Sequence, residues 1–150
     1  MGKVSMVDVG GKEVVHREAT AEGFIKLRPE TVERIREGSV EKGDIFSVAT
    51  TAAILAVKKV PELIPLTHNI PITHVDVSFE VLDEGVKASV TVKTDARTGV
   101  EMEALAGVSA ALLNVWDMVK KYEKDESGQY PHTEIRYVRV VKKVKTSLNP

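Results

Sequence analysis

The sequence contains no cysteine, which excludes disulfide bonds, thiolate metal ligands and a cysteine nucleophile. It also lacks a dominant charge, since 21 lysines and arginines stand against 22 aspartates and glutamates, for a formal net charge of -1. A broad electrostatic attraction to nucleic acid or to an anionic membrane is therefore not expected. Aromatic residues make up only 5 % of the chain, and none lies at 86–94, in a strand that would have to stack bases in an RNA-binding sheet. The composition thus argues against a nucleic-acid-binding module.

Long hydrophobic runs are missing as well. No stretch approaches the ~20 consecutive apolar residues of a membrane span, and residues 1–18 contain none long enough for a signal peptide. We therefore expect a cytoplasmic protein with no membrane partner. The 150 residues match the common size of one compact domain, and 43 % of them are hydrophobic, enough for a single core. We expect one domain over 1–150, in which the polar residues 1–12 form a flexible tail.

Hydrophobic periodicity predicts four strands and three helices. The clearest signal is a pair of alternating segments at 75–81 and 86–94, which a short turn at 83–85 joins into an antiparallel hairpin. The other expected elements are a strand at 14–27, a short helix at 29–38, a helix at 44–58, a long helix at 98–124, and a strand at 134–141 followed by a frayed tail.

Individual residues predict where the helices begin and end. Pro29 suits the first turn of the short helix, and Gly38 can close it in a left-handed conformation. Asp44 can cap the second helix. Thr98 and Glu101 have the spacing of a capping box for the long helix.

This order of elements is the split βαβ arrangement. It predicts an α+β, ferredoxin-like fold with a four-stranded antiparallel sheet and helices packed on one face. The first half of the long helix contains the small-residue run ALAGVSAALL, which would let either its own sheet or a neighbouring subunit approach closely. Because the same scaffold carries enzymes, RNA binders and ligand sensors, the fold does not define a function.

A first candidate for chemistry is the segment EKGD at 41–44, at the start of a helix. Lys42 and the free backbone N–H groups there could meet an anionic group, which the helix dipole also favours. On spacing alone, an ordinary surface loop with Asp44 as its cap is the preferred interpretation.

A second candidate is His68, in the proline-stiffened segment PELIPLTHNIP. A rigid loop can hold a histidine in place to bind a substrate or to move protons near neutral pH, although a lone loop histidine is more often simply exposed. His74 lies six residues later, but without a third ligand no metal site is expected.

A third candidate is the long helix itself. Asp117 and Lys120 are three apart, so they share one helix surface and can shift each other's proton affinity. The pair could act as acid and base, or it could be an exposed ion pair worth about half a kcal/mol. Glu101 and Glu103 at the start of the helix cannot share a face, so one is expected to cap the helix while the other points elsewhere.

Together these segments resemble the MoaC family, the cyclic pyranopterin monophosphate synthases. The stretch KGDIFSVATTAAILAVKKVPELIPLTHNIP is similar to the family's KGD segment, alanine-rich helix and PL-Cys-His loop, and TGVEMEALAGVSAALLNVWDMVK is similar to its most characteristic motif. The early segment VVHREATAEGFIKL also fits. The resemblance runs from about Met6 to Lys143, with three long motifs in the correct order.

The resemblance implies an enzyme that rearranges 3′,8-cyclised GTP into cyclic pyranopterin monophosphate and releases pyrophosphate, as an early step of molybdenum cofactor biosynthesis. It implies that Asp117 and Lys120 are catalytic and that Lys42 completes the acid–base set. The substrate pocket would be lined by Leu66, Thr67, His68, Glu101, Met102 and Glu103, with a weaker claim for Lys121. The sequence requires no metal or organic cofactor, although a divalent ion could accompany the triphosphate. The resemblance also implies a homohexamer built as a trimer of dimers with active sites at subunit boundaries.

Two departures from the family pattern stand out. Thr67 occupies a position where many relatives have cysteine, so a thiol is not required and contact through the loop backbone or the hydroxyl is expected. The glycine- and lysine-rich tail of many bacterial members is also missing, which leaves Lys143 and Lys145 as the candidates for a phosphate contact there.

The main alternative is a ferredoxin-like sensor that binds a nucleotide or pterin without turning it over. An Asp–Lys pair has no necessary role in such a sensor. Loss of Asp117 should therefore abolish the product of an enzyme but leave ligand binding by a sensor nearly intact.

Overall fold

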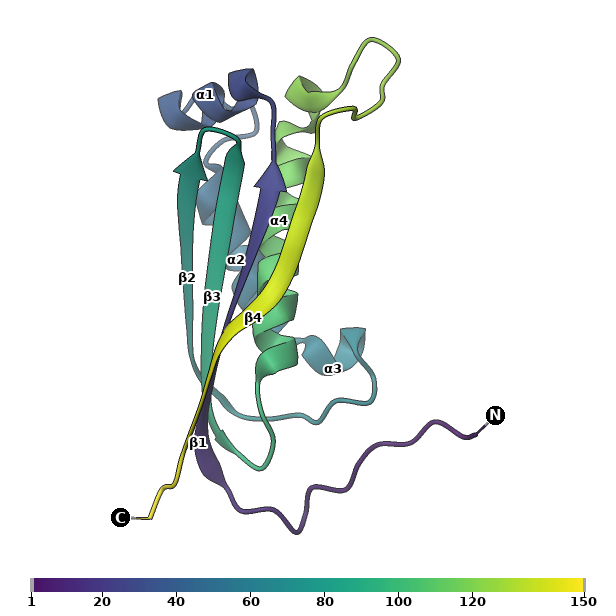
Figure 1. Ribbon diagram of the computed structural model, residues 1–150, viewed down its shortest axis with the longest axis vertical. Helices are drawn as coiled ribbons and strands as arrows, with labels where there is room; N and C mark the ends of the chain where they lie inside the picture. The colour runs from purple at the N-terminus through teal and green to yellow at the C-terminus, as the bar shows by residue number, and fades with distance from the viewer. Residues whose placement is uncertain (1, 150) are drawn as a thin grey trace.

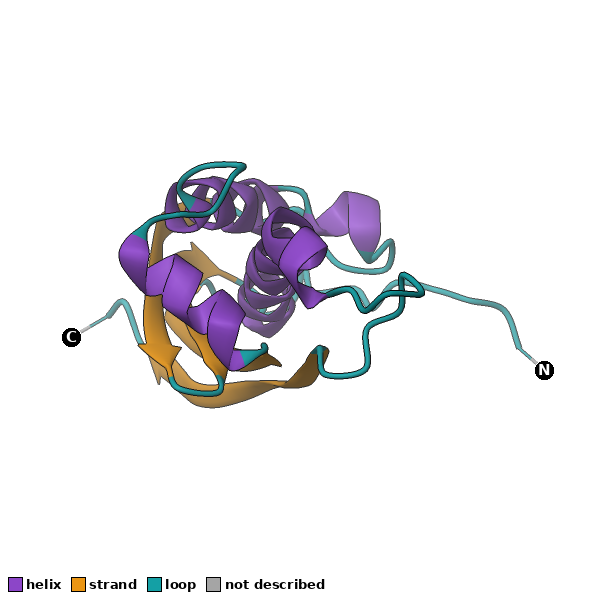
Figure 2. Cartoon of the chain, turned by 90° about the horizontal axis from the view of Figure 1, so that it is seen from above, coloured by secondary structure: helices purple, strands orange, loops and turns teal. Residues whose placement is uncertain are grey.

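The computed structural model describes residues 2–149 and has four strands and four helices. In chain order these are β1 (Val15–Lys26), α1 (Pro29–Glu37), α2 (Ile45–Lys58), α3 (Val60–Leu63), β2 (Ile72–Leu82), β3 (Gly85–Ala96), α4 (Glu101–Glu123) and β4 (Glu134–Thr146). The strands form one antiparallel sheet in the order β2-β3-β1-β4 (Figure 1). The helices cover one face of that sheet (Figure 2), which confirms the predicted ferredoxin-like α+β fold.

Two of the predicted helix ends are confirmed by their hydrogen bonds. Asp44 caps α2, because its carboxylate accepts from the backbone N–H groups of Phe46 and Ser47 at 3.0 and 3.4 Å. Gly38 ends α1 with a φ of 69°, and its N–H bonds back to the carbonyls of Arg34 and Ile35. The loop between α1 and α2 is therefore fixed at both of its ends.

Three local predictions were wrong. The capping box of Thr98 and Glu101 does not form, because α4 begins at Glu101 and its N-cap is Val100, whose side chain has no oxygen to accept a bond from the first turn. A short helix, α3, occupies the start of the proline-rich segment that we expected to be a rigid loop, since Pro61 suits a first helical turn. The expected frayed tail after 141 is instead part of β4, which pairs with β1 as far as Thr146 opposite His16.

The small-residue segment of α4 packs inside its own domain. Gly107 faces Val57 of α2 and Val90 of β3, whose methyl groups lie 3.0 and 3.1 Å from where a Cβ at Gly107 would be. On β1, a Cβ at Gly23 would lie only 2.6 Å from a methyl carbon of Val108. Gly23 is therefore required for the close approach of α4 to β1, whereas a Cβ at Gly107 would push the two valine side chains back slightly.

By length and composition alone α4 could cross a membrane, although charged residues interrupt its apolar sequence. More than half of its most apolar stretch is buried inside the protein. The residues that make the helix apolar, such as Val108, Leu112 and Val115, belong to the hydrophobic core. The hydropathy of α4 is thus accounted for by its packing on the sheet.

A buried carboxylate joins three elements at one end of the fold. Glu123, the last residue of α4, is 0 % exposed. Its oxygens accept hydrogen bonds from the backbone N–H of Arg28 at the start of α1 (3.1 and 3.2 Å), from Thr31 of α1, and from Thr133 (2.6 Å) just before β4. Four bonds to charged oxygens offset the cost of burying them.

We predict that Thr31→Val lowers the free energy of unfolding by about 1–3 kcal/mol, because it removes one donor from a buried charged group. The matched control is Thr73→Val, which removes the bond from an exposed hydroxyl to the carbonyl of Lys93 and should change stability by no more than about 0.5 kcal/mol. Urea unfolding of both variants measures the difference. Equal losses would mean that the Glu123 cluster does not stabilise the fold.

Candidate active site

Lys42, Asp117 and Lys120 meet at the C-terminal part of α4. The ammonium of Lys42 donates to the Asp117 carboxylate (Oδ2, 3.0 Å) and to the Asp117 main-chain carbonyl (3.1 Å). Lys120 Nζ lies 3.3 Å from the other carboxylate oxygen. One carboxylate is therefore bridged by two ammonium groups from two separate parts of the chain, a cluster that we call the lysine group.

The loop before α2 brings Lys42 to this cluster. Glu41, its neighbour, forms an ion pair with Lys121 of α4. Lys121 thus lies beside the lysine group without touching Asp117, and it is mostly exposed. Of the predicted site residues, it has the most peripheral place at this end of the helix.

Hydrogen bonds from Lys42 and then Lys120 hold the pKa of Asp117 below its ordinary value. Asp117 is accordingly a carboxylate at neutral pH. The ion pair between Glu41 and Lys121 likewise lowers the pKa of the glutamate and raises that of the lysine. The cluster offers cations that can hold an anionic ligand, together with a carboxylate that can exchange a proton once those cations are engaged elsewhere.

The other predicted residues gather around a pocket of about 500 Å³ at the opposite end of α4. Its predicted lining residues are Leu66, Thr67, His68, Glu101, Met102 and Glu103. The hydroxyl of Thr67 donates to the carbonyl of Ile64 (2.7 Å), so it fixes the loop backbone. His68 Nε2 donates to the carbonyl of Val7 (2.7 Å), which ties this loop to the N-terminal segment.

The sequence patterns missed the contribution of the N-terminal segment to this pocket. Ser5, Val7, Val9 and Lys12 line one side of it, although residues 2–12 form no helix or strand. A short polar segment without periodicity carries no signal of where it will lie. Its predicted flexibility stays a prediction.

Two carboxylates, Glu101 and Glu103, line the pocket together with the cation of Lys12. Glu103 is only 4 % exposed, and burial, followed by the nearby charge of Glu101, raises its pKa. Glu101 is 3.6 Å from the ammonium of Lys143 on β4. Lys143, one of the two lysines that the sequence offers for a phosphate contact near the C-terminus, is therefore beside this pocket.

Within one chain, the lysine group and the pocket lie too far apart to form a single site. Asp117 follows Glu101 by sixteen positions of continuous helix, which corresponds to about 24 Å at the helical rise of roughly 1.5 Å per residue. The candidate site residues therefore form two clusters, one at each end of α4.

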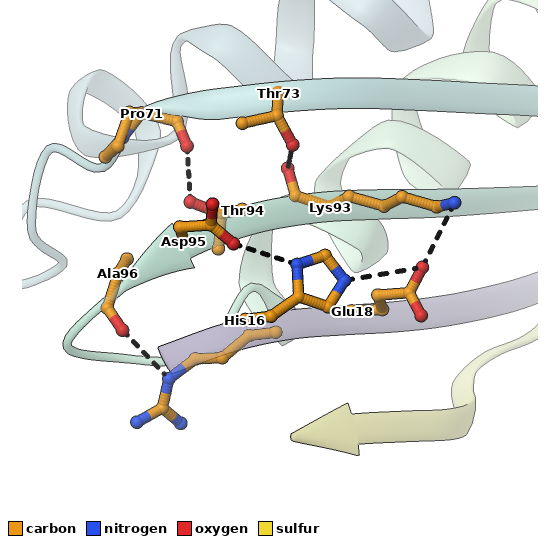
Figure 3. Close-up of polar contacts among 9 residues, drawn as sticks. His16, Glu18, Pro71, Thr73, Lys93, Thr94, Asp95 and Ala96 are labelled. Atoms are coloured by element: carbon orange, nitrogen blue, oxygen red, sulfur yellow. Dashed lines mark hydrogen bonds and ion pairs between the residues drawn. The ribbon is translucent and has the colours of Figure 1, made fainter. Parts of the chain in front are cut away.

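The outer face of the sheet carries a third set of polar residues, around a shallow pocket of about 300 Å³. His16 contacts Asp95 at 2.9 Å, and Lys93 contacts Glu18 at 3.2 Å (Figure 3). His74 lies near them on β2, and among residues 2–149 no group of three or more acidic or histidine side chains is arranged to hold a metal ion. These are cross-strand polar pairs, as expected on a solvated sheet face.

We predict that Glu103→Gln stabilises the protein more at pH 7 than at pH 4. Since the pKa of Glu103 is raised above its ordinary 4.5 in the folded state, the folded protein binds this proton more tightly than the unfolded chain, and stability falls as the pH rises through that range. Glutamine, which stays neutral, avoids this loss. Thermal unfolding of the variant and the wild type at both pH values measures this difference in stability. Glu37→Gln, at an exposed position, is the control. An equal effect of Glu103→Gln at both pH values would contradict the prediction.

The sequence matches the model of the MoaC family over residues 6–146. Similar curated proteins include one from Aeropyrum pernix, 61 % identical over 145 residues, which cover 97 % of this chain and 99 % of the relative. Another, from Sulfurisphaera tokodaii, is 57 % identical over 97 % of both chains, and one from Methanosarcina mazei is 59 % identical over 96 % of this chain and 92 % of the relative. All three are named probable cyclic pyranopterin monophosphate synthase. With a family match across nearly its whole length, the chain belongs to the MoaC family.

Proposed function

We propose that the protein converts (8S)-3′,8-cyclo-7,8-dihydroguanosine 5′-triphosphate to cyclic pyranopterin monophosphate and releases diphosphate. It is thus a lyase of molybdenum cofactor biosynthesis, acting in the cytoplasm. The observation that carries this proposal is the likeness, over almost the full length, to relatives that are named for this product. The contact of Asp117 with two lysines is consistent with acid–base chemistry on a phosphorylated substrate.

The lysine group suits the triphosphate end of such a substrate. Lys42 and Lys120 can neutralise phosphate charge and stabilise the leaving diphosphate. Asp117 then exchanges protons with the rearranging rings, a role in which a positioned group contributes typically ~10²- to 10⁴-fold.

The pocket at the start of α4 suits the guanine-derived end. Its carboxylates, Glu101 and Glu103, can accept hydrogen bonds from ring N–H and amino groups. His68, held by Val7, and Thr67, held by Ile64, give this pocket a stiff wall.

Two copies of the chain are needed to bring these halves together, because α4 holds them about 24 Å apart. We therefore propose a homo-oligomer in which the lysine group of one subunit faces the pocket of another, within a hexamer arranged as a trimer of dimers. Apolar side chains left uncovered on the outer helices support such contacts: Leu55 of α2 is 51 % exposed and Leu113 of α4 is 59 % exposed. Val48 and Ala52 extend the apolar stripe on α2.

We predict that the purified protein forms cyclic pyranopterin and diphosphate from enzymatically prepared 3′,8-cyclised GTP, and that Asp117→Asn lowers the rate at least about 100-fold. Chromatography of the pterin and a diphosphate assay measure the two products. Asp83→Asn, at an exposed turn outside both clusters, where the carboxylate pairs with Arg36, is the matched control and should keep wild-type activity. Substrate binding without product from the wild type would instead indicate the sensor.

A second prediction concerns the shared site. Asp117→Asn and the double variant Glu101→Gln/Glu103→Gln should each be inactive alone, since each lacks one half of the site. When the two are unfolded and refolded together, random assembly gives about a quarter of the sites one intact half from each kind of subunit, and activity returns to that level. As a control, the two variants are refolded separately, then mixed and assayed immediately, before their subunits can exchange. No recovery after joint refolding would contradict a site built from two subunits.

A further inference from the structure

The hydroxyl of Tyr122 on α4 accepts a hydrogen bond from the backbone N–H of Glu41, at 2.8 Å. Glu41 immediately precedes Lys42, and Tyr122 lies five residues after Asp117 on the same helix. Within residues 2–149, this is the hydrogen bond that joins the backbone of the loop at 38–44 to α4. The tyrosine therefore contacts the loop one residue away from the lysine that reaches Asp117.

Arg34 of α1 fixes the ring of this tyrosine. Its guanidinium carbon lies 4.4 Å from the centre of the Tyr122 ring, a cation–π contact. The same guanidinium donates to the carbonyl of Ser39 in the loop at 3.4 Å, and the N–H of Ser39 bonds to the carbonyl of Arg34 at 2.9 Å. Arg34 thus contacts both the ring and the loop that the ring's hydroxyl holds.

The other end of α1 is fastened to the same turn of α4. Arg28 donates from its side chain to the main-chain carbonyl of Tyr122 at 3.0 Å. Its backbone N–H bonds to the buried carboxylate of Glu123, the next residue. Consecutive residues of α4 therefore hold the beginning of α1 and the loop that follows it.

The ion pair between Lys42 and Asp117 cannot itself hold this loop in place. Asp117 is 56 % exposed, and exposed pairs of this kind contribute at most about 1 kcal/mol while a flexible lysine loses rotamer freedom. A lysine on a loop contacts a particular carboxylate oxygen more of the time when the backbone of that loop is already fixed.

We propose that Tyr122 is a positioning residue for the reaction proposed above: its hydroxyl, with Arg34 against its ring, fixes the backbone of Glu41 so that Lys42 reaches Asp117. This inference rests on the proposed function for its catalytic consequence. The geometric part, the reach of Lys42, can be measured without any turnover. The competing role is a purely structural one, since the ring also packs against the hydrophobic core. Phenylalanine would fill that role equally well.

Tyr122→Phe in the full-length protein separates the two roles, because it removes the hydroxyl and keeps the ring. With the hydroxyl gone, we expect Lys42 to spend less time on Asp117, so the pKa of Asp117 rises part of the way towards the value in Lys42→Ala. NMR titration of the Asp117 carboxyl measures this. We expect kcat to fall roughly tenfold while KM changes less than about twofold, as for a displaced catalytic group. The thermal unfolding temperature should stay near that of the wild type.

Tyr130→Phe is the matched control, because it removes a tyrosine hydroxyl from a ring that packs edge-on against Trp116, with 5.3 Å between the ring centres. It should change neither the titration nor kcat. Should Tyr122→Phe fail to fold, Arg34→Met tests the same arrangement by removing the guanidinium that contacts the Tyr122 ring. It should also raise the pKa of Asp117. An unmoved Asp117 titration overturns the proposal whatever happens to kcat. A shifted titration with unchanged kcat overturns the link to the reaction. A shifted titration in Tyr122→Phe, combined with a wild type that forms no product, upholds the geometric part and shows that the proposed function is wrong.

Discussion

The packing of α4 against β1 determines where the candidate site residues lie. At Gly23 the two backbones are so close that an added Cβ would be 2.6 Å from Val108, 2.8 Å from Leu112 and 2.9 Å from the carbonyl of Tyr137. Tightly packed interiors do not absorb such overlaps without moving an element. A displaced α4 would carry both clusters with it, because the pocket is built at its first turn and the lysine group near its last.

The charges at the two ends of α4 agree with the physics of the helix. Glu101 and Glu103 are in its first turn, and Lys120 and Lys121 in its last. A helix favours negative charge at its N-terminus and positive charge at its C-terminus, by about 0.3–1 kcal/mol per group at an exposed site. Placing a carboxylate-lined pocket and a lysine group on one helix is therefore compatible with its stability. Burial of Glu103, which raises its pKa, is the exception.

Short-range patterns in the sequence were sufficient for the hairpin of β2 and β3, for the Asp44 cap and for the end of α1 at Gly38. The contact between Lys42 and Asp117 was reached only through the family motifs, since 75 residues separate them and no periodicity relates them. The bond of Val7 to His68 had no signal, because residues 2–12 lack a pattern. The extension of β4 to Thr146 was missed because strand pairing with β1, rather than local propensity, stabilises a basic segment there.

The depressed pKa of Asp117 constrains how the proposed reaction can use it. While Lys42 and Lys120 hydrogen-bond to the carboxylate, it is a weak proton acceptor. A triphosphate that draws either ammonium away removes the interaction that lowers its pKa, so binding of the anionic end increases the basicity of Asp117. Proton transfer would then become available only when substrate occupies the lysine group. For this coupling the lysines must be held close to Asp117 yet remain free to turn, which fits their attachment to a fixed backbone and their exposed side chains.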